Sequence, residues 1–269
     1  YLLKKGYDML MLQEDFNYHD VLSVFLEDDY KMDEWTGDVD IVGRTIEYLH
    51  LQNHRFECDG LMACWKNDLT VTPAGRTSWQ QNFGKFSHAA DELIRKGFRR
   101  SELTLANGTR ILVYNMHMDA GDLADEKEGV DTLDRAARLS QWQQLKDDVL
   151  DHLDTRPIIV VGDMNSYYCR DQIKAKFIDA IADSGKGTAS DVWVELEKGG
   201  KYPAPVEGIV ACEDDANMLE NGEVLDKIIC INPTTGTKIK PVSFVYDTEG
   251  YKHAGKPLGD HNPVAATFV

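Results

Sequence analysis

The chain has 269 residues, of which 42% are hydrophobic and 28% are charged, and its formal net charge is −17 at pH 7. These proportions are ordinary for a globular protein, and the length allows one large domain or two small ones. An anionic surface repels nucleic acid, so tight non-specific binding of nucleic acid is not expected. No apolar run approaches the roughly 20 residues of a membrane-spanning helix, so no integral membrane contact is expected.

The cysteines and the first residues bear on the cellular location. None of the five cysteines forms a CxxC pair, which argues against a zinc ribbon, and their odd number excludes complete internal pairing. Disulfides Cys58–Cys64 or Cys212–Cys230 and free buried thiols are the alternatives. No secretory signal is visible, but the chain starts at Tyr1 without a Met, as expected if an upstream leader or strand has been removed.

Strand-like apolar runs alternate with amphipathic stretches, which predicts a mixed α/β protein. The elements predicted in the first half are a strand at Tyr7–Gln13, a helix at Asn17–Leu26, and strands at Leu61–Trp65, Leu69–Thr72, Leu103–Thr104 and Arg110–Asn115. Lys66–Asp68 is predicted to form a hairpin turn between the second and third strands. The Asn-Gly pair within Ala106–Thr109 predicts a second hairpin.

The second half contains the clearest helix, at Asp131–Leu153. Its apolar residues recur every three or four positions and so form one face: Leu139, Trp142, Leu145, Val149 and Leu153. Further strands are predicted at Ile158–Gly162, Leu225–Ile231 and Val264–Phe268. No repeat or linker is visible, so residues 1–269 are expected to form a single domain.

Polar side chains gather where the predicted strands end or begin. They are Glu14 after the first strand, Asn115 and His117 on one face of another, Asp163 and Asn165 after a third, Asp226 at the start of a fourth, and Asp260 and His261 before the last. Each has a plain alternative, such as an exposed acid, a hydrogen-bonded core histidine or an Asx turn. Their common position at strand ends favours one shared site.

This set of side chains suits a particular chemistry. Carboxylates are ligands for a hard divalent cation, and two imidazoles in different environments can serve as an acid and a base. Hydrolysis of a phosphate ester needs an activated water, neutralised charge on the phosphate oxygens and a stabilised leaving group. The sequence therefore favours cation-assisted cleavage of a phosphate ester.

The order and spacing of these residues resemble the endonuclease/exonuclease/phosphatase superfamily, the DNase-I-like fold, from Gly6 to Val269. Gly162–Asn165 and Asp260–Val264 are the most specific parts of the match. The resemblance implies a four-layer α/β sandwich of two central, mostly antiparallel sheets flanked by helices, and Mg²⁺- or Mn²⁺-dependent hydrolysis. The family's first strand is missing before Tyr1, and Gly259 replaces a usual Ser.

The resemblance also implies a role for each candidate residue. Glu14 and Asp260 resemble metal ligands, His261 the general base, Asp226 the carboxylate that orients it, His117 the second catalytic imidazole, and Asp163 and Asn165 the pair that positions the nucleophile and holds the phosphate. Asn115, His117 and Asn165 are the expected substrate contacts.

One stretch resembles bacterial sphingomyelinase-like phosphodiesterases more narrowly. The pattern starts at Asn115–Gly121 and continues to Asp134, Arg138 and Gln141. Asp134 and Arg138 are expected to pair on the long helix and anchor the loop after His117. Lys96–Arg100 is either a phosphate contact or an exposed turn, and Trp79–Gly84 is a candidate substrate-side loop.

The leading hypothesis is a metal-dependent phosphodiesterase acting on a phospholipid headgroup or a similar small diester. A DNA or RNA nuclease is the first alternative, although the acidic charge does not favour it. A non-catalytic binding module of the same fold is the second. The resemblance further suggests a secreted or periplasmic protein.

Overall fold

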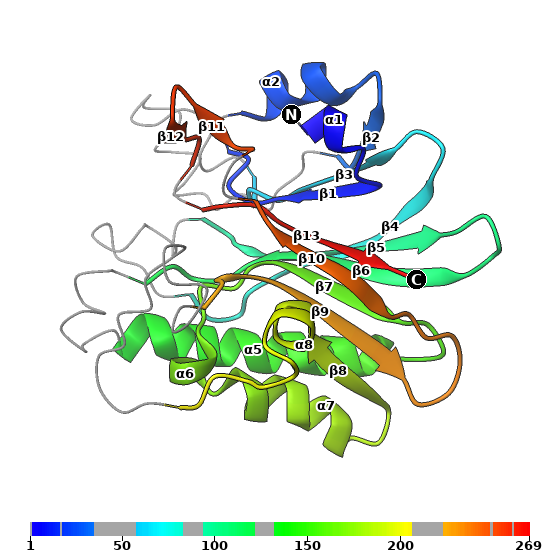
Figure 1. Cartoon of the computed structure of the whole chain (residues 1–269). Coiled ribbons are helices and arrows are strands. Elements are labelled where there is room, and N and C mark those ends of the chain that lie inside the picture. Colours follow the sequence, from blue (N-terminus) through cyan, green and yellow to red (C-terminus); the bar gives the residue numbers. More distant parts are fainter. Residues whose placement is uncertain are drawn as a thin grey trace.

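A mixed six-stranded sheet forms the centre of the structure, a computed structural model that describes residues 2–16, 18–34, 58–82, 94–121, 132–205, 223–247, 250–259 and 261–269 (Figure 1). Its strand order is β4-β5-β6-β7-β9-β8. The strands are β4 (Thr70–Ser78), β5 (Gly97–Thr104), β6 (Arg110–His117), β7 (Ile158–Asp163), β9 (Asp226–Pro233) and β8 (Gly187–Asp191). Only the β6–β7 pair is parallel among these neighbours.

Helices cover one face of this sheet. The long helix α5 (Thr132–His152) packs Trp142, Leu145 and Val149 against Tyr114 and Met116 of β6 in one buried cluster. The same layer holds α6 (Tyr168–Asp171), the π-helix η1 (Lys174–Asp179) and α7 (Ala180–Asp183), while α8 (Val192–Glu197) follows β8. The parallel β6–β7 pair requires this crossover, because its second strand must start at the end where the first one started.

Two smaller sheets cover the other face. One has the order β1-β3-β2, with β1 (Met9–Leu12), β2 (Tyr30–Met32) and β3 (Met62–Lys66), and the other pairs β10 (Pro241–Tyr246) with β13 (Val264–Phe268). Both pack on the cluster that contains Val113 and Ile228 of the central sheet. Among the described residues, β1 pairs with β3 on one edge and has no partner strand on the other edge.

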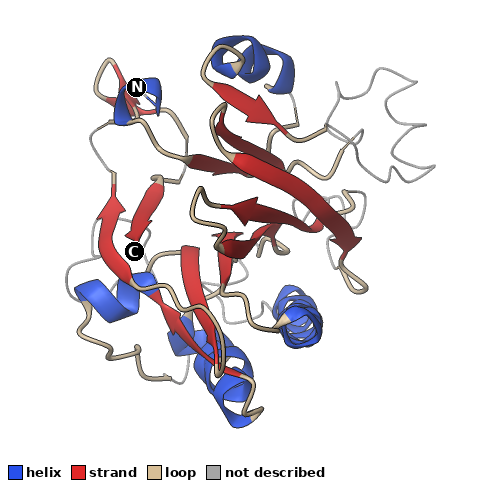
Figure 2. Ribbon diagram, turned by 90° about the vertical axis from the view of Figure 1, so that its right-hand side faces the viewer, coloured by secondary structure: helices blue, strands red, loops and turns tan. Residues whose placement is uncertain are grey.

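The outermost layer lies beyond the β1-β3-β2 sheet. It contains α1 (Leu2–Lys5) and α2 (His19–Leu26), and Leu26 packs on a third cluster with Leu10 and Met62. A small hairpin, β11 (Lys252–His253) and β12 (Lys256–Pro257), precedes β13. Strands thus lie between helices above and below (Figure 2), and the predicted four-layer DNase-I-like architecture is confirmed.

Most predicted elements are present within a few residues of their predicted bounds. Helix 131–153, the strands from 110, 158, 225 and 264, and the hairpin at Ala106–Thr109 are confirmed. The hairpin predicted at Lys66–Asp68 is wrong, because β3 and β4 belong to different sheets. A tight turn here carries the chain from one layer to the next, and turn residues alone do not distinguish the two outcomes.

Candidate active site

Three candidate residues form a row across the central sheet. His117 at the end of β6 lies opposite Asp163 at the end of β7, and Asp163 lies opposite Asp226 at the start of β9. β6 and β7 end on the left side of Figure 1, where β9 begins. Side chains alternate along a strand, so these three side chains lie on the same face of the central sheet as Val113 and Ile228. That face packs against the two smaller sheets.

The loop before β13 adds His261 to this row. Its Nδ1 lies 2.7 Å from Oδ2 of Asp226, and its Nε2 lies 4.0 Å from Oδ2 of Asp163. Nε2 of His117 lies 3.4 Å from that same Oδ2. Two imidazoles therefore flank one carboxylate oxygen, and a second carboxylate holds the far side of the His261 ring.

Gly162 brings the row together. A Cβ at this position would lie 1.9 Å from the carbonyl oxygen of Met116, and its φ is +146°. β6 and β7 approach each other here more closely than any other residue allows. This close backbone approach, directly before Asp163, is thus to the neighbouring strand.

Asn165 closes the turn after β7 in a left-handed conformation, with φ +44°. Its backbone N–H donates to Oδ1 of Asp163 at 2.9 Å, and its side-chain amide donates to Oδ2 of Asp163 and to the Met118 carbonyl, each at 3.2 Å. The Asx-turn alternative is therefore present, and it holds the Asp163 carboxylate in place. A strained turn beside a row of charged groups is typical of functional sites.

Asp163 is held ionised. Burial raises the pKa of this carboxyl, but the His117 hydrogen bond, the positive charge of both imidazoles and the Asn165 N–H outweigh burial and hold the pKa well below its ordinary value. Burial raises the pKa of Asp226 against the hydrogen bond from His261, and the negative Asp163 adds to that rise. The pKa values of these two neighbouring carboxyls are thus shifted in opposite directions, as in sites for acid–base catalysis.

One group of described residues has the composition of a cation site. Ligand atoms of Asp163, Asp226 and His261 all lie within 4.8 Å of one another. Ionised carboxylate oxygens fit a hard cation such as Mg²⁺ or Mn²⁺. Glu14 is not part of this group, and Asp260 lies outside the described residues, so their predicted roles as ligands stay predictions.

Glu14 nevertheless lies on a turn at the same end of the molecule. It follows β1, is exposed and has φ +59°, a conformation that few residues other than glycine adopt. Nε2 of the preceding Gln13 donates to Oδ1 of Asn115 at 2.7 Å, two residues before His117 on β6. The end of β1 is thereby tied to the end of β6.

Asn115 links the two layers. Its Nδ2 donates to the carbonyl oxygens of Leu12 and Met62, at 3.2 and 3.1 Å, while Oδ1 accepts from Gln13. This buried amide is engaged between the sheets, and the predicted contact of Asn115 with substrate stays a prediction.

The turn that carries Glu14 is pinned from the other side by residues that sequence patterns did not single out. The Asp15 N–H donates to the Gly60 carbonyl at 3.0 Å, and the Phe16 ring lies where a Cβ of Gly60 would stand. Asp59, which is fully buried, accepts from Arg76 and forms a two-bond pair with Arg99. No local signal in the sequence pairs these distant segments.

His117 has an unusual environment for a core histidine. The indole Nε1 of Trp79 donates to its backbone carbonyl at 2.7 Å, and the ring is 1% exposed. Its Nδ1 is buried and, in the described part of the chain, has no hydrogen-bond partner. Trp79 is therefore buried and supports the end of β6. This burial argues against the predicted place of Trp79 in a substrate-side loop.

The structure tests one of the two interpretations of Lys96–Arg100, and the predicted phosphate contact stays a prediction. Most of this stretch belongs to β5, and its cations are engaged inside the protein: Lys96 with the Met118 carbonyl, Arg99 with Asp59 and Asp33, and Arg100 with Asp148 of α5. The exposed-turn interpretation is wrong, because alternate residues of the strand meet acids from opposite layers.

The loop after His117 is anchored on α5. Gln141 exchanges two hydrogen bonds with Asp119, at 2.7 and 3.0 Å, and the fully buried Arg138 donates to the Asp119 carbonyl. The expected anchoring of this loop by the helix is thus observed, through Gln141 and Arg138. The specific pairing of Arg138 with Asp134, itself buried, stays a prediction.

The described cysteines are thiols. Cys58, Cys64, Cys169 and Cys230 are buried and form no disulfide, so the Cys58–Cys64 disulfide is wrong. Cys212 lies outside the described residues.

Solved structures of other proteins share this architecture. An endonuclease/exonuclease/phosphatase from Bacteroides vulgatus superposes with a TM-score of 0.59 at 13% identity, covering 100% of this chain and 87% of that one. TDP2 from D. rerio in complex with a single-strand DNA product superposes with a TM-score of 0.62 at 13% identity, covering 100% and 88%. These likenesses show the fold, and the predicted resemblance to this superfamily is confirmed.

The chain is also similar in sequence to curated proteins. A sphingomyelinase from Mycobacterium tuberculosis is 29% identical over 180 residues, which cover 65% of this chain and 31% of the relative. The match thus takes in about a third of the length of that relative. No protein-family model matches the chain.

Proposed function

We propose that this chain hydrolyses a phosphodiester with the help of a divalent cation, Mg²⁺ or Mn²⁺, and that its substrate is a phospholipid headgroup. The observation that carries the proposal is the row of His117, Asp163 and Asp226 completed by His261. It provides a low-pKa carboxylate, a carboxylate–imidazole pair and a second imidazole within a few ångströms.

His261 is the proposed general base. Asp226 fixes its Nδ1, so Nε2 is the ring nitrogen that would take a proton, and the side chain is 32% exposed, which gives water access to the ring. A base oriented by a carboxylate is the usual arrangement for activating a nucleophile. Asp226 also stabilises the imidazolium that forms when the proton is taken.

His117 and Asn165 act on the other side of Asp163. His117 keeps Asp163 ionised and, when protonated, supplies positive charge beside a phosphate oxygen or a proton for the leaving group. The Asn165 turn fixes the orientation of Asp163 through two hydrogen bonds.

A bound divalent cation would neutralise charge on the non-bridging phosphate oxygens. Asp163 is suited to hold it because its low pKa keeps it anionic over the physiological range. Glu14 and Asp260 are the further ligands we propose.

The substrate class rests on charge and on the curated relatives. A chain of net charge −17 whose β5 cations are engaged internally offers little attraction to a polyanion. The relatives at 29% identity are sphingomyelinases, which favours a lipid headgroup over nucleic acid. The likeness to TDP2 bound to a DNA product makes a nuclease the alternative outcome of the test.

The test is hydrolysis of bis-p-nitrophenyl phosphate, p-nitrophenyl phosphate, sphingomyelin and plasmid DNA, each with Mg²⁺ and with EDTA. Metal-dependent cleavage of sphingomyelin and the simple diester, with DNA spared, is the expected result. Activity that survives EDTA would contradict the cation, and nicking of DNA would transfer the proposal to a nuclease. Silence on every substrate would leave the binding-module alternative.

A further inference from the structure

The helix α2 has two apolar faces, although only one of them meets the core. Leu22 and Leu26 lie on the inner face and pack on the cluster under the β1-β3-β2 sheet. Tyr18, Val21, Val24 and Phe25 are exposed by 66, 54, 68 and 69%. At about 100° per residue these four fall on one continuous arc of about 120°.

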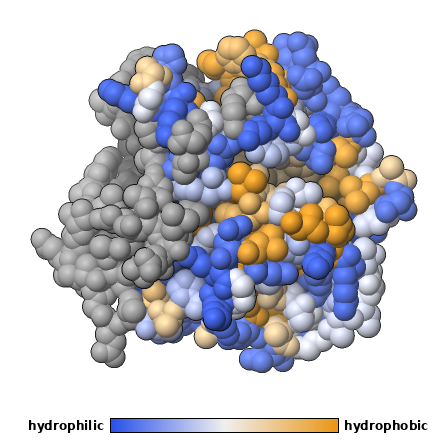
Figure 3. Space-filling view, viewed as in Figure 1, coloured by the Kyte–Doolittle hydropathy of each residue, from blue (hydrophilic) through white to orange (hydrophobic). Residues whose placement is uncertain are grey.

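Such an outer face is unusual for a surface helix, which normally turns polar side chains to water. Figure 3 shows it as an apolar patch at the top of the molecule, over α2, with hydrophilic surface beside it. α2 follows β1 through the turn that carries Glu14, which is one of the proposed cation ligands.

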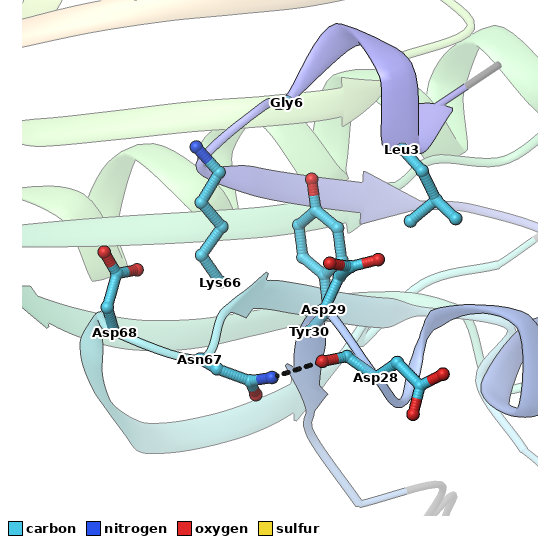
Figure 4. Close-up of a pocket in the computed structure, with 8 residues that line it drawn as sticks. All are labelled: Leu3, Gly6, Asp28, Asp29, Tyr30, Lys66, Asn67 and Asp68. Atoms are coloured by element: carbon cyan, nitrogen blue, oxygen red, sulfur yellow. Dashed lines mark hydrogen bonds between the residues drawn. The ribbon is translucent and has the colours of Figure 1, made fainter.

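Acidic groups flank this patch. Asp20 and Glu27 are surface neighbours of Val24, at i−4 and i+3, on the edge of the outer face that lies away from the core, and Asp28 and Asp29 follow directly. Asp28 and Asp29 line a hollow of about 330 Å³ together with Asp68 and Leu3 (Figure 4). Lys66 in this hollow pairs with Asp8, and the nearby Lys5 pairs with Asp247.

The patch thus combines exposed aliphatic and aromatic side chains with carboxylates. An anionic bilayer would be repelled by these carboxylates and by the net charge of −17. A bilayer of phosphocholine lipids fits, because its outermost charge is a quaternary ammonium, which aromatic rings and carboxylates attract. Aromatic and aliphatic side chains bind such an interface by burying apolar area near the headgroups.

We propose that the α2 face formed by Tyr18, Val21, Val24 and Phe25 docks the protein on the surface of a phosphocholine bilayer. This inference rests on the proposed lipid-headgroup function and adds the surface through which that substrate is met. No helix in the described parts of the chain is long and apolar enough to cross a membrane.

The test is flotation of the full chain with phosphatidylcholine vesicles in EDTA, with phosphatidylglycerol vesicles as the anionic comparison. The double variant Val21→Ser/Phe25→Ser should bind phosphatidylcholine at least about tenfold more weakly. Leu133→Ser is the control, because Leu133 is an exposed leucine of α5, a helix on the other side of the central sheet from α2 (Figure 1), and it should leave binding unchanged. Phe25→Leu keeps an apolar side chain and should keep most of the binding.

Absence of binding by the unsubstituted chain, equal binding by the double variant, or a preference for phosphatidylglycerol would overturn the proposal. Activity with Mg²⁺ separates it from the proposed function. The double variant should cleave soluble bis-p-nitrophenyl phosphate normally but lose activity on sphingomyelin vesicles in parallel with binding. If no diester is cleaved while binding follows the expected pattern, the hydrolase proposal fails and the docking surface stands.

Discussion

Two groups of charged residues lie between the layers of this protein, and their hydrogen bonding differs. Around Asp59, each carboxylate oxygen receives two donors, and the Arg99 guanidinium is shared between Asp59 and Asp33. In the row, Nδ1 of His117 has no hydrogen-bond partner among the described residues, and Nε2 of His261 lies 4.0 Å from the Asp163 oxygen, too far for a hydrogen bond. A group whose hydrogen-bonding atoms all have partners within the protein stabilises the fold. A buried polar atom without such a partner is available to a ligand.

The largest expected effect is a loss of activity, without a loss of stability, when a residue of the row is replaced. His261→Ala should lower kcat about 10²–10⁴-fold because it removes the base, while the melting temperature stays close to that of the unsubstituted protein. His253→Ala, at an exposed histidine of β11, is the control and should leave both unchanged. Steady-state kinetics on bis-p-nitrophenyl phosphate and thermal unfolding check this prediction. Full activity of His261→Ala would remove the proposed base.

The second prediction concerns the group around Asp59. Arg99→Ala should lower the free energy of unfolding by about 3–5 kcal/mol, since it strips the buried Asp59 of its two-bond partner. Urea unfolding measures the loss. Arg110→Ala breaks an exposed pair with Glu102 and should change stability little. A loss no larger than that of the control would show that Arg76 alone is sufficient to hold Asp59.

A third, smaller effect tests how Phe16 holds the turn of Glu14. Gly60→Ala and Gly185→Ala start from the same backbone strain, with φ +71° and +72°, but only at Gly60 would the new Cβ overlap a side chain, at 2.4 Å from the Phe16 ring. Gly60→Ala should therefore be less stable than Gly185→Ala by about 1–3 kcal/mol. Equal losses in urea unfolding would mean that the Phe16 ring moves without cost.

The smallest effect is a pH dependence. Because the folded-state pKa of Asp163 is depressed, its ionisation stabilises the fold fully above its ordinary pKa of about 4. As the pH falls toward the folded pKa, this contribution is lost. The stability difference between the unsubstituted protein and Asp163→Asn should thus be constant near neutral pH and shrink below about pH 4. A difference that grows on acidification would contradict the assigned shift.

Sequence patterns predicted the residues of the row, but they did not predict the ion pairs between layers that surround it. Asp163 ends an apolar strand and Asp226 begins one, so the hydrophobic pattern located both residues without knowledge of the strand order. The Lys66–Asp68 error arose because the same turn residues serve a hairpin or a change of layer. The engaged cations of β5 escaped prediction because their acidic partners come from distant segments, and pairing across layers leaves no periodic signal.

The parallel pairing of β6 with β7 has a consequence for the order of folding. His117 and Asp163 meet only after α5 has crossed the sheet, and Asp226 joins them only after the helices between β7 and β9 have been placed. Contacts that close such long loops form late, because the loss of chain entropy precedes the gain from packing. During refolding, the far-ultraviolet signal of α5 should therefore return before the two imidazoles lie beside Asp163, and recovery of activity should follow the slowest phase.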